Sequence, residues 1–238
     1  MMATKRRPAP RIEGGNYLSR MQRLVVLPAY YLFLAMPYPL RKVATALYIA
    51  FALLGRKLTG VERYHQPTPT DKLYSLGFWG VPAVDVAAYT LTVDGAVRRP
   101  LRLSFGELLE MADVERAVTL DCVGGSRNNC SMRGVSLRSL LALAQPAEEA
   151  ATVVFHCADG YYTTHPLSVL AERDAFVAYE VNGQRLPRLG YPLRLAVPGK
   201  YGYKWAKWVE RIELVADDRK GYWESRGLPH RADIGDIW

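Results

Sequence analysis

The sequence has few of the residues that bind metals or form crosslinks. Its 238 residues include three cysteines and four histidines. The cysteines, Cys122, Cys130 and Cys157, contain no CxxC pair, and the histidines show no HExxH spacing. These absences argue against a structural zinc site and a disulfide framework. We also find no haem or iron–sulfur motif, internal repeat or low-complexity tract.

Acidic residues are scarce only near the N-terminus. Residues 1–62 contain ten Lys or Arg and two acidic residues, whereas residues 63–238 contain 21 of each kind. The net charge of +8 therefore belongs to the first segment, and the rest of the chain is neutral. A neutral body argues against nucleic acid as a partner, although basic and aromatic residues interleave in residues 200–208.

The apolar runs of the first segment are short for a membrane span. Residues 24–40 form an uncharged run of 17 residues with three prolines, and residues 43–55 form a run of 13. A spanning helix needs about 20 apolar residues. We expect residues 20–60 to contact an anionic membrane surface or a membrane partner, and the alternative is a helical hairpin packed on the protein itself. The long charged stretch before the run is atypical of a cleavable signal peptide.

Residues 63–238 predict a domain that mixes strands with short helices. A capping box at Ser104 and Glu107 predicts a helix through Met111. Further helices are predicted at 134–144 and 166–172, and strands at 88–95, 116–121, 151–157, 174–181, 191–197 and 205–215. Because these elements follow no βαβ rhythm, we predict the α+β class.

The central feature of this domain is Cys122. The apolar strand pattern of residues 116–121 leads into it, and Val123 and two glycines follow. A thiol at a strand end, with flexible backbone that can approach a bulky ligand, is typical of a soft-metal ligand or a nucleophile. Inert packing of a buried cysteine is the alternative.

A second feature is a cluster of cations around residue 200. Arg194 lies inside an apolar strand pattern, where a guanidinium is costly unless an anion meets it. Lys200, Lys204 and Lys207 follow among glycine and aromatic residues, with room for a phosphate. The cluster predicts a site for one anionic cofactor.

Five ordered motifs make the domain recognisable. They are DCVGG at 121–125, RGVSLR at 133–138, AYEVNGQRLP at 178–187, GYPLRLAVPG at 190–199 and KWVERIEL at 207–214. From about Pro67 onward the chain resembles the molybdopterin-binding domain of the sulfite oxidase superfamily, including the catalytic subunits of methionine-sulfoxide reductases. The resemblance implies a mixed, barrel-like β-sheet fold with Mo-molybdopterin as cofactor, and the first 60 residues lie outside it.

The resemblance also implies residue roles. Cys122 matches the thiolate that binds molybdenum, and Tyr179 resembles the active-site tyrosine of sulfite oxidases. Arg194 matches the arginine that binds the pterin. The other predicted pterin contacts are Asp71, Tyr74, Ser75, Cys157, Trp205, Ala206 and Lys207.

Two positions depart from the family pattern. Leu189 stands where the family has His or Asn, so a polar pterin contact is lost or replaced. Arg127 is the one cation close behind Cys122 in the sequence, where sulfite oxidases have several arginines. Sulfite is therefore not the favoured substrate, because an oxyanion pocket with one arginine is weak.

The resemblance implies two-electron oxygen-atom transfer on a small sulfur-containing or similar oxo substrate. Both a sulfite dehydrogenase and a sulfoxide reductase fit. Electrons would be exchanged with a separate partner, such as a membrane haem protein, which favours a membrane-associated bacterial protein. The alternative is a non-catalytic module that binds cofactor or partner at a membrane.

Overall fold

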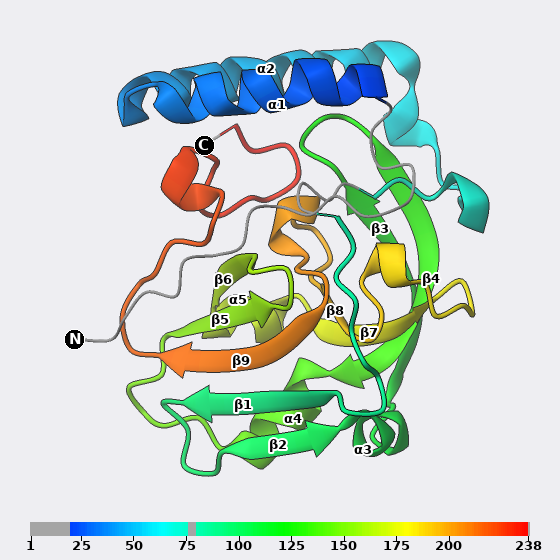
Figure 1. Cartoon of the computed structure of the whole chain (residues 1–238), viewed down its shortest axis with the longest axis vertical. Coiled ribbons are helices and arrows are strands. Elements are labelled where there is room, and N and C mark those ends of the chain that lie inside the picture. Colours follow the sequence, from blue (N-terminus) through cyan, green and yellow to red (C-terminus); the bar gives the residue numbers. More distant parts are fainter. Residues whose placement is uncertain (1–19, 76–79, 238) are drawn as a thin grey trace.

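A layer of two helices lies across one end of a body made from two β-sheets (Figure 1). The computed structural model describes residues 20–75 and 80–237. Helix α1 spans Arg20–Ala35 and helix α2 spans Tyr38–Thr59. The chain turns between them at Pro37, whose missing N–H interrupts the helical hydrogen bonds. Neither these helices nor any other in the described ranges has the length and apolarity needed to cross a membrane.

The first sheet has five strands in the order β2-β1-β9-β5-β6. Its strands are β1 (Thr90–Gly95), β2 (Leu101–Ser104), β5 (Thr152–Cys157), β6 (Tyr162–Pro166) and β9 (Val209–Val215). The β1–β9 pair is parallel, and the other pairs are antiparallel.

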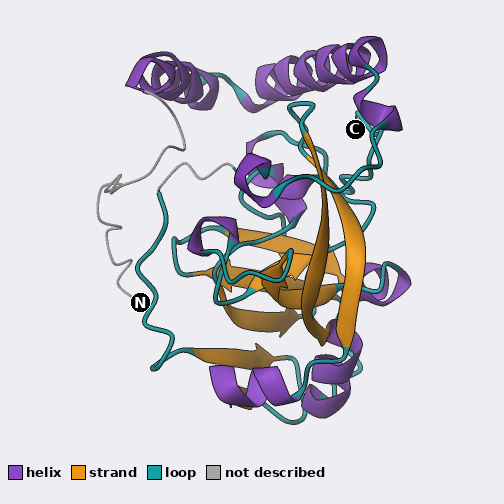
Figure 2. Ribbon diagram, turned by 90° about the vertical axis from the view of Figure 1, so that its right-hand side faces the viewer, coloured by secondary structure: helices purple, strands orange, loops and turns teal. Residues whose placement is uncertain are grey.

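The second sheet has four antiparallel strands in the order β3-β4-β7-β8. They are β3 (Val114–Asp121), β4 (Arg127–Ser136), β7 (Phe176–Val181) and β8 (Arg194–Ala196). The β3–β4 hairpin is long and curved, and its tip reaches the helical layer (Figures 1 and 2). Its last pair is Asp121 with Arg127, so residues 122–126 form the tip. The fold therefore brings Cys122 to helix α2.

Three short α-helices cover the sheets. They are α3 (Phe105–Glu110), α4 (Leu137–Ala144) and α5 (Leu167–Glu172). The Ser104–Glu107 capping box is present, with Ser104 Oγ accepting from the backbone N–H of Glu107. One apolar core joins both sheets, with Leu91, Phe155 and Phe176 fully buried in it. The predicted class and the mixed-sheet architecture are confirmed.

Strand β4 corrects one prediction. The helix predicted at 134–144 begins three residues later than expected, because residues 127–136 form one strand and α4 begins at Leu137. Polar residues occupy buried positions in this strand because their side chains form hydrogen bonds. Asn129, for example, accepts from Thr119 Oγ1 at 2.8 Å and donates to the Tyr64 carbonyl at 2.8 Å. Pairing with β3 overrides the low strand propensity.

The helical layer packs against the C-terminal part of the chain. The Tyr30 and Tyr222 hydroxyls are hydrogen-bonded, and the Tyr30 ring meets Trp223 edge-on at 6.0 Å between centroids. Gly227, with φ of +112°, lies so close to α2 that a Cβ there would be 3.3 Å from Arg41.

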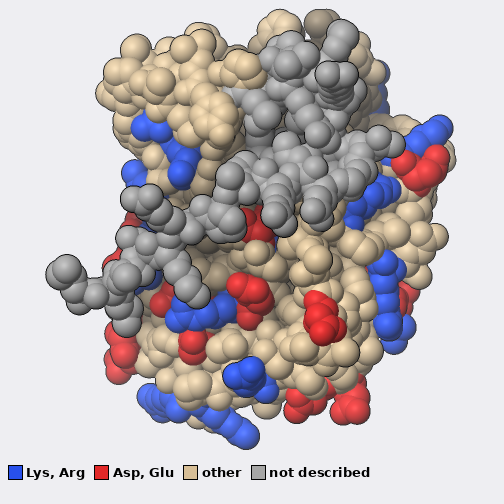
Figure 3. All heavy atoms as spheres, in the orientation of Figure 1, with Lys and Arg blue, Asp and Glu red and all other residues tan. Residues whose placement is uncertain are grey.

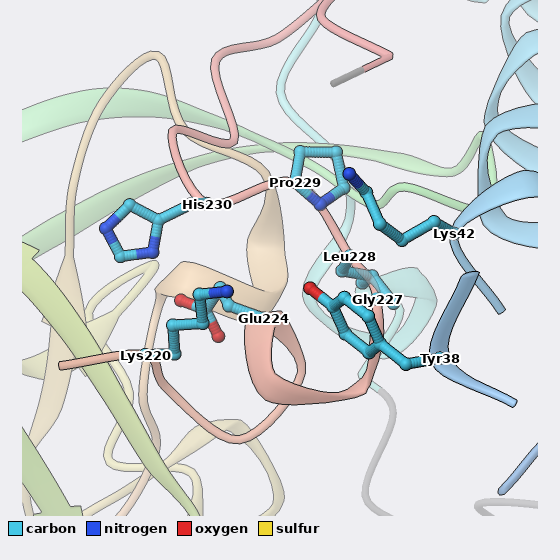
Figure 4. Close-up of a pocket in the computed structure, with 8 residues that line it drawn as sticks. All are labelled: Tyr38, Lys42, Lys220, Glu224, Gly227, Leu228, Pro229 and His230. Carbon is cyan, nitrogen blue, oxygen red and sulfur yellow. The ribbon is translucent and has the colours of Figure 1, made fainter.

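A cavity of about 230 Å³ opens beside this junction (Figure 4). Tyr38 and Lys42 of α2 line one side, and the C-terminal segment lines the other. None of its lining residues is a predicted site residue.

Candidate active site

Cys122 lies in the tip of the β3–β4 hairpin. Its N–H donates to the Ser126 carbonyl at 2.8 Å, and its carbonyl accepts from the Gly125 N–H at 2.9 Å. The Gly124 N–H points at Cys122 Sγ, 3.4 Å away. Cys122 is partly exposed, whereas Cys130 and Cys157 are buried. Cys122 is therefore the least enclosed of the three cysteines, although burial still raises the pKa of its thiol.

Two arginines hold Asp121, the residue before Cys122. Arg127 forms a two-pronged pair with the carboxylate, at 2.7 Å from Nε and 2.9 Å from Nη2. Arg56 of α2 forms an ion pair with Asp121 Oδ1 at 2.9 Å, and both side chains are almost fully buried. Arg127 Nη1 also donates to the Glu62 carbonyl at 2.9 Å. Arg127 thus anchors the loop, which differs from its predicted role as the substrate's cation.

Two tyrosines lie near the thiol. Burial, together with the charges of Cys122 and Tyr48, raises the pKa of Tyr74 to about 12. Asn128 fixes the Tyr74 backbone, accepting from its N–H at 3.0 Å and donating to its carbonyl at 2.7 Å. Tyr74 was predicted, whereas Tyr48 and Asn128 were missed.

Arg194 and Lys207 meet in a buried cradle. A Cβ on Gly190, whose φ is +111°, would be 2.8 Å from Arg194 Cβ and 3.1 Å from Lys207 Cβ. Lys207 Nζ donates to Ser75 Oγ at 3.1 Å, and its backbone lies against Cys157. The structure therefore brings four predicted cofactor contacts together.

The charges and the burial of Arg194 and Lys207 fit a bound anion. Burial lowers the pKa of Arg194 to about 10, and burial with the Arg194 charge lowers the pKa of Lys207 to about 7. Arg194 Nε is buried without a hydrogen-bond partner among the residues described. Arg194 is buried and Lys207 is partly buried, and a bound phosphate, as a pterin cofactor supplies, stabilises the charged form of both.

Leu189 contacts Arg194 through its backbone carbonyl. Arg194 Nη1 donates to the Leu189 carbonyl at 2.8 Å, while the leucine side chain is buried. The residue therefore helps to orient the arginine even though its side chain offers no polar contact.

Lys200 and Lys204 have internal carboxylate partners. Lys200 pairs with Asp233 at 2.6 Å, and Lys204 pairs with Glu224 and donates to the Thr164 carbonyl. Both ammonium groups are therefore neutralised by C-terminal carboxylates, whereas Lys207 faces Arg194 and Ser75. Trp205 and Ala206 are buried just before it, and Asp71 is exposed in a short turn at 70–72.

Tyr179 lies far along the sheet from Cys122. It faces the bulge at Arg133 and Gly134, whereas Cys122 follows Asp121, which pairs with Arg127 at the opposite end of β4. Six residues of strand separate those ends, or roughly 20 Å. The Tyr179 ring packs edge-on against Phe105, with 6.2 Å between centroids. The structure therefore does not bring Tyr179 to the thiol, contrary to the role implied by resemblance.

Residues 78–223 match the family model described as the oxidoreductase molybdopterin binding domain. The chain belongs to this family. The match confirms the predicted superfamily, its Mo-molybdopterin cofactor and the class of oxidoreductase.

The curated proteins that are similar to this chain have different names. An uncharacterised oxidoreductase YuiH of Bacillus subtilis is 33% identical over 151 residues, covering 63% of this chain and 76% of that protein. The putative protein-methionine-sulfoxide reductase subunit YedZ1 of Azospira oryzae is 31% identical, covering 68% of this chain and 62% of that protein. Sulfite oxidase of Gallus gallus is 30% identical, covering 66% and 41%. The chain thus spans less than two thirds of the latter two.

A solved structure shares the fold. It is the sulfane dehydrogenase SoxCD of Paracoccus pantotrophus, with a TM-score of 0.60 and 24% identity, over 65% of this chain and 45% of that one. The sulfite-oxidase-type fold is thereby confirmed.

Proposed function

We propose that the protein is a molybdenum-cofactor-dependent oxidoreductase that transfers an oxygen atom, with two electrons, to or from a small oxo substrate. One observation carries the proposal. Tyr74 is hydrogen-bonded to Asn128, which pairs with Leu120 close to the hairpin tip that carries Cys122, and its neighbour Ser75 is hydrogen-bonded to Lys207. Two consecutive residues therefore link a metal-binding thiol to a phosphate cradle, as a single cofactor with a metal end and a phosphate end requires.

Each residue has a role in this proposal. Cys122 would bind molybdenum as a thiolate, because metal binding removes the thiol proton. Arg194 and Lys207 would bind the phosphate end, and Tyr74 and Ser75 would hold the middle. The bound cofactor would supply the redox chemistry, while the protein positions it and excludes competing reactions.

The charge near the thiol favours an uncharged oxo substrate, such as a sulfoxide, over sulfite. Arg56 and Arg127 both pair with Asp121, so their charges are partly neutralised. A divalent oxyanion gains little from such a pair of cations. Dye-linked assays with dimethyl sulfoxide and with sulfite compare the two classes directly. Turnover of sulfite alone would contradict the sulfoxide preference.

Metal analysis tests the main proposal. We expect one molybdenum and one pterin per chain in protein purified from a host that makes the cofactor. Cys122→Ala should lose dye-linked activity and keep the pterin, since Arg194 and Lys207 still hold it, and Cys122→Ser is the conservative control. Absence of molybdenum from the wild type would contradict the proposal and favour the alternative, a non-catalytic binding module.

We further propose that α2 docks on an anionic membrane surface, where a haem protein or other carrier exchanges electrons with the site. An outward stripe on α2 is apolar and exposed. It consists of Leu40, Val43, Leu47, Phe51, Leu54 and Leu58. Residues 20–59 contain six Lys or Arg and no acidic residue, and Figure 3 shows this layer without acidic side chains on the face drawn. Apolar side chains with basic neighbours suit an interfacial helix.

Vesicle binding tests this surface. We expect wild-type protein to sediment with vesicles that contain anionic lipid, and the pair Leu47→Glu with Phe51→Glu to lose binding. Leu143→Glu is the matched control, because Leu143 is an exposed leucine on α4. Equal binding by all three proteins would contradict docking through α2.

A further inference from the structure

One row of α2 faces the Cys122 loop. Tyr48, Ala52 and Arg56 are spaced by four residues, so they share one face of the helix. Arg56 contacts Asp121, and a Cβ on Gly125 would be 3.7 Å from both the Ala52 carbonyl oxygen and Arg56 Cγ. The row therefore runs along the hairpin tip, with Tyr48 at its far end.

The Tyr48 hydroxyl and the thiol flank the same point. A Cβ on Gly124 would be 2.6 Å from Tyr48 Oη and 3.7 Å from Cys122 Sγ. Gly124 is absent from the glycines with positive φ, so its backbone conformation does not require glycine. A Cβ there would nevertheless displace the Tyr48 hydroxyl, the far end of a side chain that can move aside, because a Cβ closer than 3.0 Å forces a shift. Loop and helix are thus fitted to each other.

The helix is also fixed in this position. The ion pair of Arg56 with Asp121 is almost fully buried, and Tyr30 and Gly227 join the helical layer to the C-terminal segment. Tyr48 itself is 55% exposed, so its ring borders both the thiol loop and solvent. A side chain in this position borders the path by which a small molecule reaches Cys122.

We propose that α2 forms one wall of the substrate pocket and that Tyr48 is a specificity-determining residue, whose hydroxyl donates a hydrogen bond to the substrate's oxygen. This rests on the proposed function. The matched family domain begins at residue 78, so α2 lies outside it. The wall is therefore supplied by this chain's own N-terminal segment, and the relatives' substrates do not define its pocket.

The first test uses protein without cofactor. We measure alkylation of Cys122 by iodoacetamide at fixed pH, by peptide mass spectrometry. Tyr48→Ala should alkylate about tenfold faster because the ring no longer covers the loop, and Tyr48→Phe should match the wild type. Tyr31→Ala is the matched control, since Tyr31 is an exposed tyrosine on α1. Equal alkylation rates in the wild type and the three variants would contradict the proposal that α2 forms a wall of the pocket.

The second test uses cofactor-loaded protein. The substrate is dimethyl sulfoxide or sulfite, whichever one the protein turns over in the dye-linked assay. Tyr48→Phe should raise KM about 5- to 10-fold through loss of one hydrogen bond, with molybdenum content unchanged. Tyr31→Phe should leave KM unchanged. An unchanged KM in Tyr48→Phe would overturn the donor role. Finding no molybdenum in the wild-type protein would instead contradict the proposed function. The alkylation rates would still show whether α2 forms the wall.

Discussion

Arg56 of helix α2 forms a buried ion pair with Asp121, the residue directly before Cys122, at 2.9 Å. The pair joins the N-terminal helical layer to the loop that carries the predicted metal ligand. Arg56 Nε and Nη1 are buried without hydrogen-bond partners in the described chain. Since a buried guanidinium is costly unless it is paired, Asp121 is what keeps α2 in place.

We predict that Arg56→Met lowers the free energy of unfolding by about 2–4 kcal/mol, because Asp121 loses one of two buried partners. Arg127 remains on the carboxylate, which limits the loss. Chemical denaturation measures the change. Lys57→Met is the control, since Lys57 is the exposed neighbour on the same helix, and its effect should stay within about 0.5 kcal/mol. A similar loss in both variants would contradict a special role for the pair.

The sequence predicted the local settings of Arg194 and Cys122 correctly. Arg194 inside an apolar strand is costly without an anion, and the structure shows it buried beside Lys207. Cys122 was predicted at a strand end and lies directly after β3. Both predictions use local chemistry, in which one polar residue in an apolar setting needs a partner.

The rest of the site depends on tertiary contacts. Lys200 and Lys204 have the same local pattern as Lys207, and only the position of the C-terminal tail shows that Asp233 and Glu224 neutralise them. Tyr48 lies in an apolar helix outside residues 78–223, which match the family model. Arg56 did carry a signal, because an arginine within the helix pattern of residues 43–59 suggests a buried partner, as at Arg194.

We predict that Tyr179→Phe leaves KM and kcat within about twofold of the wild type. Its ring packs on Phe105, and strand geometry puts it roughly 20 Å from the thiol. Steady-state dye-linked kinetics measure both constants, with Tyr48→Phe as the responsive comparison. A large loss in kcat with molybdenum retained would restore the role that the family resemblance implies.

We predict that anion binding to the cradle weakens as pH rises through about 7, the lowered pKa of Lys207. A bound anion favours the charged amine and raises this pKa. Below pH 7 the amine is already protonated, so affinity is constant. Above pH 7 binding must take up a proton, and affinity falls by up to about tenfold per pH unit.

Calorimetric titration of cofactor-free protein with sulfate, between pH 6 and 9, measures this dependence, because sulfate itself does not titrate in that range. Lys207→Arg should remove it, since a guanidinium stays charged. Lys57→Arg is the control on an exposed lysine. The same pH dependence in Lys207→Arg would show that another group is responsible.

The fit between Gly124 and Tyr48 gives the sharpest prediction. Gly124→Ala should cost up to about 1 kcal/mol of stability, because its Cβ would stand 2.6 Å from Tyr48 Oη and the half-exposed tyrosine must move aside. In a Tyr48→Phe background that oxygen is gone, and the next atoms are at an ordinary 3.7 Å, so the same change should cost almost nothing. A double-mutant cycle by chemical denaturation measures this coupling. Gly55→Ala, in open space on α2, should instead stabilise both backgrounds equally, by about 0.5–1 kcal/mol. Additive effects of Gly124→Ala and Tyr48→Phe would mean that the Tyr48 hydroxyl does not contact Gly124, which would contradict the place of Tyr48 in the proposed pocket wall.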